Sequence, residues 1–134
     1  MNSNTQLVPV SKKRLWAGRV VSALPVLMLL FSGVMKLMKP PAVLQGFAHY
    51  GYPESLISVL GILEIVCTLV YLIPRASVLG AILMTGYLGG AVSTHVRAGS
   101  PLFETIFPVI LGVLVWAGIF VRDAQLRQLV PLRR

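Results

Sequence analysis

Hydrophobic residues dominate four long runs of this chain, and short polar or glycine- and proline-containing stretches separate the runs. Each run is close to the ~20 apolar residues that a helix needs to cross the ~30 Å hydrocarbon core of a bilayer. The pattern predicts an all-α fold, an integral membrane four-helix bundle, as one domain over about residues 15–121. The predicted spans are about 15–37, 56–73, 76–96 and 102–121, between a disordered basic N-terminal tail, 1–14, and a basic C-terminal tail, 122–134.

The first run has features of both a signal peptide and a retained helix. Lys12, Lys13 and Arg14 precede it, as basic residues precede the apolar segment of a signal peptide. The run is longer than that segment usually is, and no small-residue cleavage site follows it. We therefore expect a retained transmembrane helix.

The connection 42–55 is the longest and most aromatic of the loops. Its tyrosines and Phe47 are typical of the interfacial belt, and Val43–His49 can form a short helix lying in the interface. A re-entrant segment that covers the mouth of the bundle is the alternative. The second and third spans, by contrast, are joined only by Pro74 and Arg75, so they must be antiparallel neighbours.

The composition excludes an ordinary soluble domain, because 56% of the residues are hydrophobic and only 12% are charged. The net charge of +8 is compatible with nucleic acid binding. Most of the basic residues, however, lie in the tails and at the span ends, where they set topology and contact anionic lipids. We therefore expect a lipid bilayer, and no nucleic acid, as a partner.

Lysine and arginine are distributed unevenly between the two sides of the predicted bundle. Nine lie on the side of both termini and three on the other side. Because positive residues mark the cytoplasmic side, we predict that both termini are cytoplasmic (N-in/C-in) in a bacterial inner membrane. The nine are Lys12, Lys13, Arg14, Arg19, Arg75, Arg122, Arg127, Arg133 and Arg134, and the three are Lys36, Lys39 and Arg97.

Glu64 lies well inside the second apolar run. A carboxylate at that depth costs several kcal/mol unless it is protonated, paired or wetted. Helical spacing places it on one face with small and polar residues, and we expect the rest of the bundle to shelter it. The residues of this face are Gly61, Glu64, Cys67, Thr68 and Tyr71.

Two other helix faces carry polar residues toward the same region. One face of the first span includes Ser32 and Lys36, and one face of the third span includes Tyr87, Thr94 and His95. With both termini on one side, Lys36 and His95 end their helices on the outer side, and Glu64 lies about two turns inward. We expect these three titratable groups to come together in the outer half of the bundle.

Two interpretations of this group stay open. In the first, Lys36 and Glu64 form a buried pair that fixes helix register, with the lysine reaching outward. In the second, the group forms a pocket for a proton-exchanging small molecule, most naturally a quinone, and Glu64 or His95 relays protons. The candidate ligand-binding residues are Lys36, Glu64, His95, Ser32, Tyr87 and Thr94.

The remaining chemistry-bearing residues point to no cofactor held by the chain itself. Cys67 is the only cysteine, which rules out an internal disulfide and favours a small apolar filler. His49 lies in a loop without a second ligand at metal spacing, so we expect no metal and no covalently bound cofactor. Gly86 and Gly90 form a small-xxx-small pair, which makes this pair or the fourth helix a candidate homo-oligomer contact.

Four short motifs appear in order along the chain: Phe31–Lys36, Gly46–Pro53, Gly61–Glu64 and Gly90–His95. Together they closely resemble the DoxX-like family of small four-helix bacterial membrane proteins, over about residues 15–121. The resemblance implies that Lys36, Glu64 and His95 are the characteristic polar positions, without an established catalytic role. The family's namesake is a membrane subunit of a thiosulfate:quinone oxidoreductase, and relatives accompany thiol-redox enzymes or act as membrane-protein chaperones.

Three functions follow as hypotheses. The first is a quinone-interacting or electron-transfer accessory subunit of a membrane oxidoreductase, with a redox enzyme subunit as its partner. The second is a small proton-coupled transporter, and the third is a non-enzymatic membrane chaperone or scaffold. Whether the chain is itself an enzyme stays open at this point.

Overall fold

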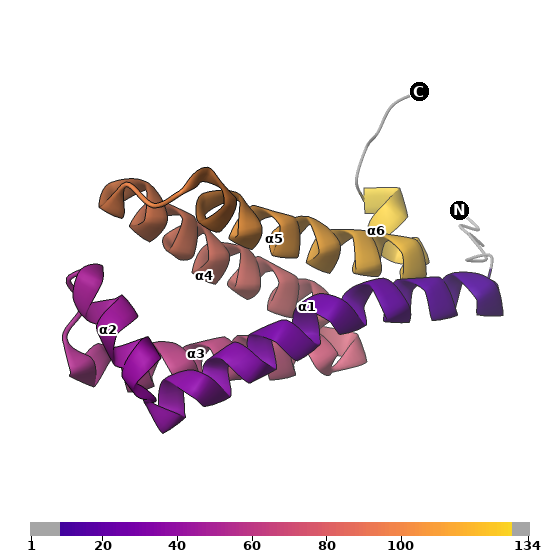
Figure 1. Cartoon of the computed structure of the whole chain (residues 1–134). Helices are drawn as coiled ribbons and strands as arrows, with labels where there is room; N and C mark the ends of the chain where they lie inside the picture. The colour runs from indigo at the N-terminus through magenta and orange to yellow at the C-terminus, as the bar shows by residue number, and fades with distance from the viewer. Residues whose placement is uncertain (1–8, 130–134) are drawn as a thin grey trace.

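A computed structural model describes residues 9–129, and every regular element in this range is helical (Figure 1). Four of the helices are long and apolar enough to cross a membrane. The prediction of an all-α membrane four-helix bundle is therefore confirmed. The elements are α1 (Lys12–Met38), α2 (Pro41–His49), α3 (Glu54–Leu72), the short 3-10 helix η1 (Pro74–Ala76), α4 (Ser77–Ala98), α5 (Leu102–Arg122) and α6 (Ala124–Leu129).

The ends of the chain differ from the predicted boundaries. Helix α1 begins at Lys12, so the basic residues 12–14 that we assigned to a disordered tail are helical. The cause is Ser11, whose side chain accepts a hydrogen bond from the Arg14 backbone N–H and so caps the helix. At the other end Arg122 completes α5, and α6 occupies part of the predicted tail. Residues 1–8 and 130–134 of the predicted tails lie outside the described range.

The spanning helices form a ring in which α1 packs against α3 and α5, and α4 packs against the same two helices. Helix α2 and the loop between α4 and α5 lie at one end, called here the α2 end (Figure 1). The start of α1, η1 and α6 lie at the other end, called here the termini end (Figure 1). Toward the α2 end the α1–α3 pair and the α4–α5 pair diverge (Figure 1).

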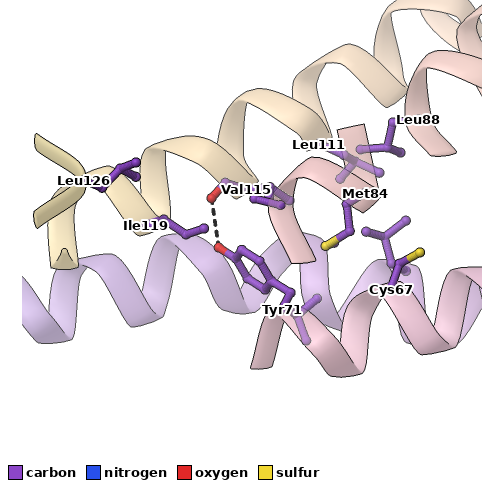
Figure 2. Close-up of a cluster of buried hydrophobic side chains, with 11 residues drawn as sticks. Cys67, Tyr71, Met84, Leu88, Leu111, Val115, Ile119 and Leu126 are labelled. Carbon is purple, nitrogen blue, oxygen red and sulfur yellow. Dashed lines mark hydrogen bonds between the residues drawn. The ribbon is translucent and has the colours of Figure 1, made fainter. Parts of the chain in front are cut away.

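The tightest packing lies toward the termini end, around Tyr71 of α3 (Figure 2). Its ring is fully buried, and its hydroxyl donates a 2.8 Å hydrogen bond to the Val115 carbonyl of α5. Ser22 of α1 lies 2.8 Å from the same hydroxyl, which leaves Ser22 as the donor of that bond. Cys67 is buried in this cluster. One tyrosine therefore connects three helices.

Glycine permits the closest approach of α1 to α3. A Cβ added to Gly61 would lie 2.9 Å from Lys36 Cβ and 3.0 Å from the Gly33 carbonyl oxygen. Because a real Cβ cannot sit so close to backbone, only glycine allows the two helices to meet here. The contact lies at the level of Lys36 and Glu64, so it sets the distance between their helices.

The predicted glycine contact on α4 is different. A Cβ at Gly86 or Gly90 would meet no atom within 4 Å, so within residues 9–129 no helix packs closely on this pair. The small-xxx-small interpretation therefore does not hold inside the chain. As a contact between two copies it stays a prediction.

Candidate functional site

A charged pair joins α1 and α3 inside the bundle. Lys36 Nζ lies 2.5 Å from Glu64 Oε2, and the Glu64 side chain is only 3% exposed. The same carboxylate oxygen accepts hydrogen bonds from Tyr87 OH of α4 at 3.1 Å and from Ser32 Oγ at 3.3 Å. Lys36 also donates to Ser32 Oγ at 2.6 Å and lies over the Tyr87 ring, 5.9 Å from its centroid. We call Ser32, Lys36, Glu64 and Tyr87 the inner group.

The sequence explains why the inner group forms. Ser32 and Lys36 are four residues apart, so they share one face of α1. Glu64 follows Gly61 by one helical turn, and the close approach at Gly61 brings it within reach of that face. Burial of the carboxylate is tolerated because a positive charge and two hydroxyl donors compensate it.

The inner group keeps hydrogen-bonding capacity in reserve. All of its donors converge on Glu64 Oε2, and no residue of the described chain donates to Oε1. An ammonium has three N–H donors, and Lys36 uses only two of them. A free acceptor and a free donor are thus available to a bound molecule.

His95 belongs to a second group near the α2 end. Tyr50 OH and Ser100 Oγ lie 3.3 Å and 3.2 Å from His95 Nδ1, and Glu104 Oε2 lies 3.9 Å from the same nitrogen. Nδ1 has one lone pair, to which either hydroxyl can donate, and in that tautomer the imidazole proton is on Nε2. Within residues 9–129 no hydrogen bond engages Nε2, so it remains free as a donor.

Hydrogen bonds to the last turns of α4, next to His95, hold the loop after α2 against that helix. Tyr52 OH lies 2.7 Å from Thr94 Oγ1, and Arg97 Nη2 donates to the Tyr50 carbonyl at 2.6 Å. Tyr50 and His95 also make an edge-to-face ring contact with centroids 5.2 Å apart. We call this assembly of residues 50–52 with Thr94, His95 and Arg97 the clasp.

The two groups line one cavity of about 640 Å³. This size lies within the range of about 300–1,000 Å³ that small-molecule sites occupy. The inner group contributes all of its side chains, and the clasp contributes Tyr50, Tyr52, Thr94 and His95. The walls between are apolar and include Leu29, Leu60, Leu63, Phe107 and Leu111. The cavity therefore suits a molecule with an apolar body and polar atoms at two places.

The structure brings together some of the predicted site residues and separates others. Lys36 and Glu64 are in direct contact with Ser32 and Tyr87, as the first interpretation of the pair requires. His95, however, has no hydrogen bond or ion pair to Lys36 or Glu64 among the described residues. The expected three-membered group is thus two groups, because the clasp holds the imidazole.

Sequence reasoning missed the part that the loop plays in the site. Tyr50 and Tyr52 were assigned to an interfacial belt and Arg97 to a topology signal, whereas all three build the clasp. Nothing in their spacing identifies the partners, because these lie more than forty residues away in α4. The clustering of aromatic residues beside a histidine-bearing helix end was the only available signal.

Metal ligation finds no support in the described part of the chain. No three His, Cys, Asp or Glu residues between 9 and 129 lie close enough together to hold an ion. Oε2 of Glu64 already accepts from the lysine and two hydroxyls, and Nδ1 of His95 lies within hydrogen-bond distance of two hydroxyls. The site therefore offers hydrogen bonds and proton positions.

Comparison with known proteins gives one assignment. A search of curated proteins and a search of solved structures each found no significant match. The family model of the DoxX-like family, by contrast, matches residues 20–118, which include Ser32, Lys36, Glu64, Tyr87 and His95. This match covers most of the chain and all of the inner group. The protein is therefore a multi-pass membrane protein that belongs to the DoxX-like family.

Proposed function

We propose that this protein binds a quinone in the cavity between the inner group and the clasp. In this role it serves as an accessory subunit of a membrane oxidoreductase. The supporting observation is the buried Glu64, whose Oε2 is saturated by donors while Oε1 remains free in a cavity with apolar walls. A quinone has two carbonyl acceptors on a flat apolar ring. Its reduction to a quinol takes up two electrons and two protons.

The donors of the site match such a ligand. Lys36 retains one N–H, and the Nε2–H of His95 is free on another wall of the same cavity. Each can donate to one carbonyl oxygen, and the apolar wall residues can pack against the ring. Glu64 is then the group placed to exchange a proton with the bound ring, because its side chain lines the cavity and its Oε1 accepts no hydrogen bond from a described residue.

The electrons come from a partner in this proposal. The single cysteine cannot form a dithiol within the chain. A separate redox subunit beside the bundle must therefore supply or accept them. The protein's own residues bind the ring, orient it and provide its protons.

The test is a binding titration in lipid nanodiscs, with a soluble quinone that has no tail as the probe. The wild-type protein should bind it, and Lys36→Met and His95→Phe should each weaken binding about tenfold, since one charge-assisted or buried hydrogen bond is worth about 1.4 kcal/mol or more. Quinone retained through purification from native membranes is the second readout.

Matched controls come from the same chain. His49→Phe changes an exposed histidine that does not line the cavity, and Lys13→Met changes an exposed lysine of α1. Both should bind as the wild type does. Equal affinity in all five proteins, or no binding by the wild type, would count against the quinone site and favour the scaffold alternative.

A proton-coupled cation transporter is less well supported. Lys36 places a positive charge beside the only buried carboxylate of residues 9–129 and neutralises it. A cationic substrate would therefore have to displace that lysine. Pull-down in mild detergent separates the remaining alternatives, because a redox subunit, an unrelated client protein or no partner each indicates a different role.

A further inference from the structure

The cavity has an open side between α3 and α4. On α4 the last buried residue is Leu88. Toward the α2 end α4 diverges from α3 (Figure 1). On this side the cavity is lined by Leu60 and Leu63 of α3 and by Gly86 and Gly90 of α4. The opening therefore lies along the spanning helices, at the height of the hydrocarbon core.

Two of the residues that line this side carry no side chain. Gly86 and Gly90 are exposed, and a Cβ on either would meet no atom within 4 Å. Leu63, across from them, is 46% exposed. On the other flank the lining includes the rings of Phe31 of α1, which is 68% exposed, and of Phe107 of α5. The glycine side carries no side chain at two of its lining positions, which leaves a route out of the cavity there.

At the α2 end the cavity is lined by the clasp. There the clasp joins the loop after α2 to α4 through the bonds of Tyr52 to Thr94, Tyr50 to His95 and Arg97 to the Tyr50 carbonyl. A molecule that enters past the clasp meets polar and aromatic side chains. On the α3–α4 side the lining residues Leu60, Leu63, Gly86 and Gly90 are apolar.

We propose that the ligand is a lipid-like molecule that enters sideways from the bilayer between α3 and α4. Its polar ring reaches Lys36 and Glu64, and its long apolar tail leaves the cavity across Gly86 and Gly90 into the lipid. This inference rests on the proposed quinone site and specifies its ligand class, a ring with a polyisoprenoid tail. The tail makes apolar contacts both in lipid and against the protein, so these contacts contribute little net affinity. The role of Gly86 and Gly90 is to leave space for the tail.

Filling that room tests the proposal. The double variant Gly86→Leu/Gly90→Leu adds side chains where no atom is met, so it can block the opening without a clash in the bundle. Two probes with the same quinone ring are titrated in nanodiscs, one with a polyisoprenoid tail and one without. We expect the double variant to bind the tailed quinone at least about tenfold more weakly and the tail-less quinone within about twofold of the wild type.

Gly89→Leu is the matched control. Gly89 is also an exposed glycine of α4 with no atom within 4 Å, but it lies on the groove between α4 and α5 and does not line the cavity. It should bind both quinones as the wild type does. Melting temperatures establish whether each variant is folded. If the double variant does not fold, the single variants Gly86→Leu and Gly90→Leu are titrated with the same two quinones instead.

The outcomes separate the two proposals. If the wild type fails to bind the tail-less quinone, the quinone site itself is wrong, and lateral entry falls with it. If the wild type binds it but the double variant keeps full affinity for the tailed probe, or Gly89→Leu weakens that affinity equally, only lateral entry is wrong. A change in oligomeric state by native mass spectrometry, without loss of tailed quinone, would assign the glycine pair to a contact between copies instead.

Discussion

The Glu64 carboxylate is tolerated inside the bundle because three side chains share the cost of burying it. Lys36 supplies the opposite charge, and Ser32 and Tyr87 supply hydroxyl donors. The gain from such a pair is small compared with the cost of breaking it, because a lone charge is left in a medium of low dielectric. The pair is therefore a poor source of net stability and an effective constraint on how α1 and α3 are placed.

A double-mutant cycle tests this at the residue scale. Lys36→Met and Glu64→Leu should each lower the free energy of unfolding by ~3–5 kcal/mol, because each leaves its partner uncompensated. The double change should recover most of the loss. Thermal unfolding in detergent measures all three, with Lys13→Met as the exposed control. Single variants that melt with the wild type would mean that each charge is solvated separately by the cavity.

At the scale of elements, the bundle uses glycine in two opposite ways. Gly33 and Gly61 bring α1 and α3 into backbone contact, whereas Gly86, Gly89 and Gly90 leave space along α4. The first pair makes the distance between two helices short enough for Lys36 to reach Glu64. The second set leaves α4 less closely packed against its neighbours near the α2 end, where the helix has no buried residue after Leu88.

The same substitution should therefore have opposite effects at two glycines. Gly61→Ala places a Cβ 2.9 Å from Lys36 Cβ and 3.0 Å from a backbone carbonyl, so the helices must separate, at a cost of ~1–3 kcal/mol. Gly89→Ala meets nothing, and the better helix propensity of alanine should stabilise it by up to ~1 kcal/mol. Thermal melts compare the two. Equal shifts in melting temperature would show that the close contact between α1 and α3 at Gly61 does not restrict the size of the side chain there.

For the whole molecule, the distribution of basic residues predicts an orientation in the membrane. The described residues place seven lysines and arginines at the termini end (Lys12, Lys13, Arg14, Arg19, Arg75, Arg122 and Arg127) and three at the α2 end (Lys36, Lys39 and Arg97). Basic residues close to span ends are retained on the cytoplasmic side. On this count we expect the α2 end and its clasp to face the outer side of the membrane.

Cysteine labelling in intact cells tests this orientation. Gln45 of α2 and Gln128 of α6 are exposed glutamines at opposite ends, and the native Cys67 is buried. A membrane-impermeant maleimide should label Gln45→Cys and leave Gln128→Cys unlabelled. Permeabilised cells, in which both should react, provide the control. Labelling of Gln128→Cys alone would reverse the topology.

Much of the bundle was predictable because it depends on local periodicity and length. The face named from spacing alone, with Gly61, Glu64, Cys67, Thr68 and Tyr71, is the buried face of α3. Helical geometry dictates this, since residues three and four apart must share a side. The Lys36–Glu64 pair was one of the two interpretations that the sequence left open, because a buried carboxylate requires a partner and few were available.

The sequence by itself therefore determined the all-helical membrane bundle and the need to compensate Glu64. Length, hydropathy and the cost of a buried charge act on each segment, whatever its neighbours are. Only the tertiary structure decided which partners meet across long separations: Tyr50 with His95, Tyr71 with Val115, and close contact at Gly61 but open space at Gly86. These depend on how the helices diverge around the cavity, and that packing is a property of the whole bundle.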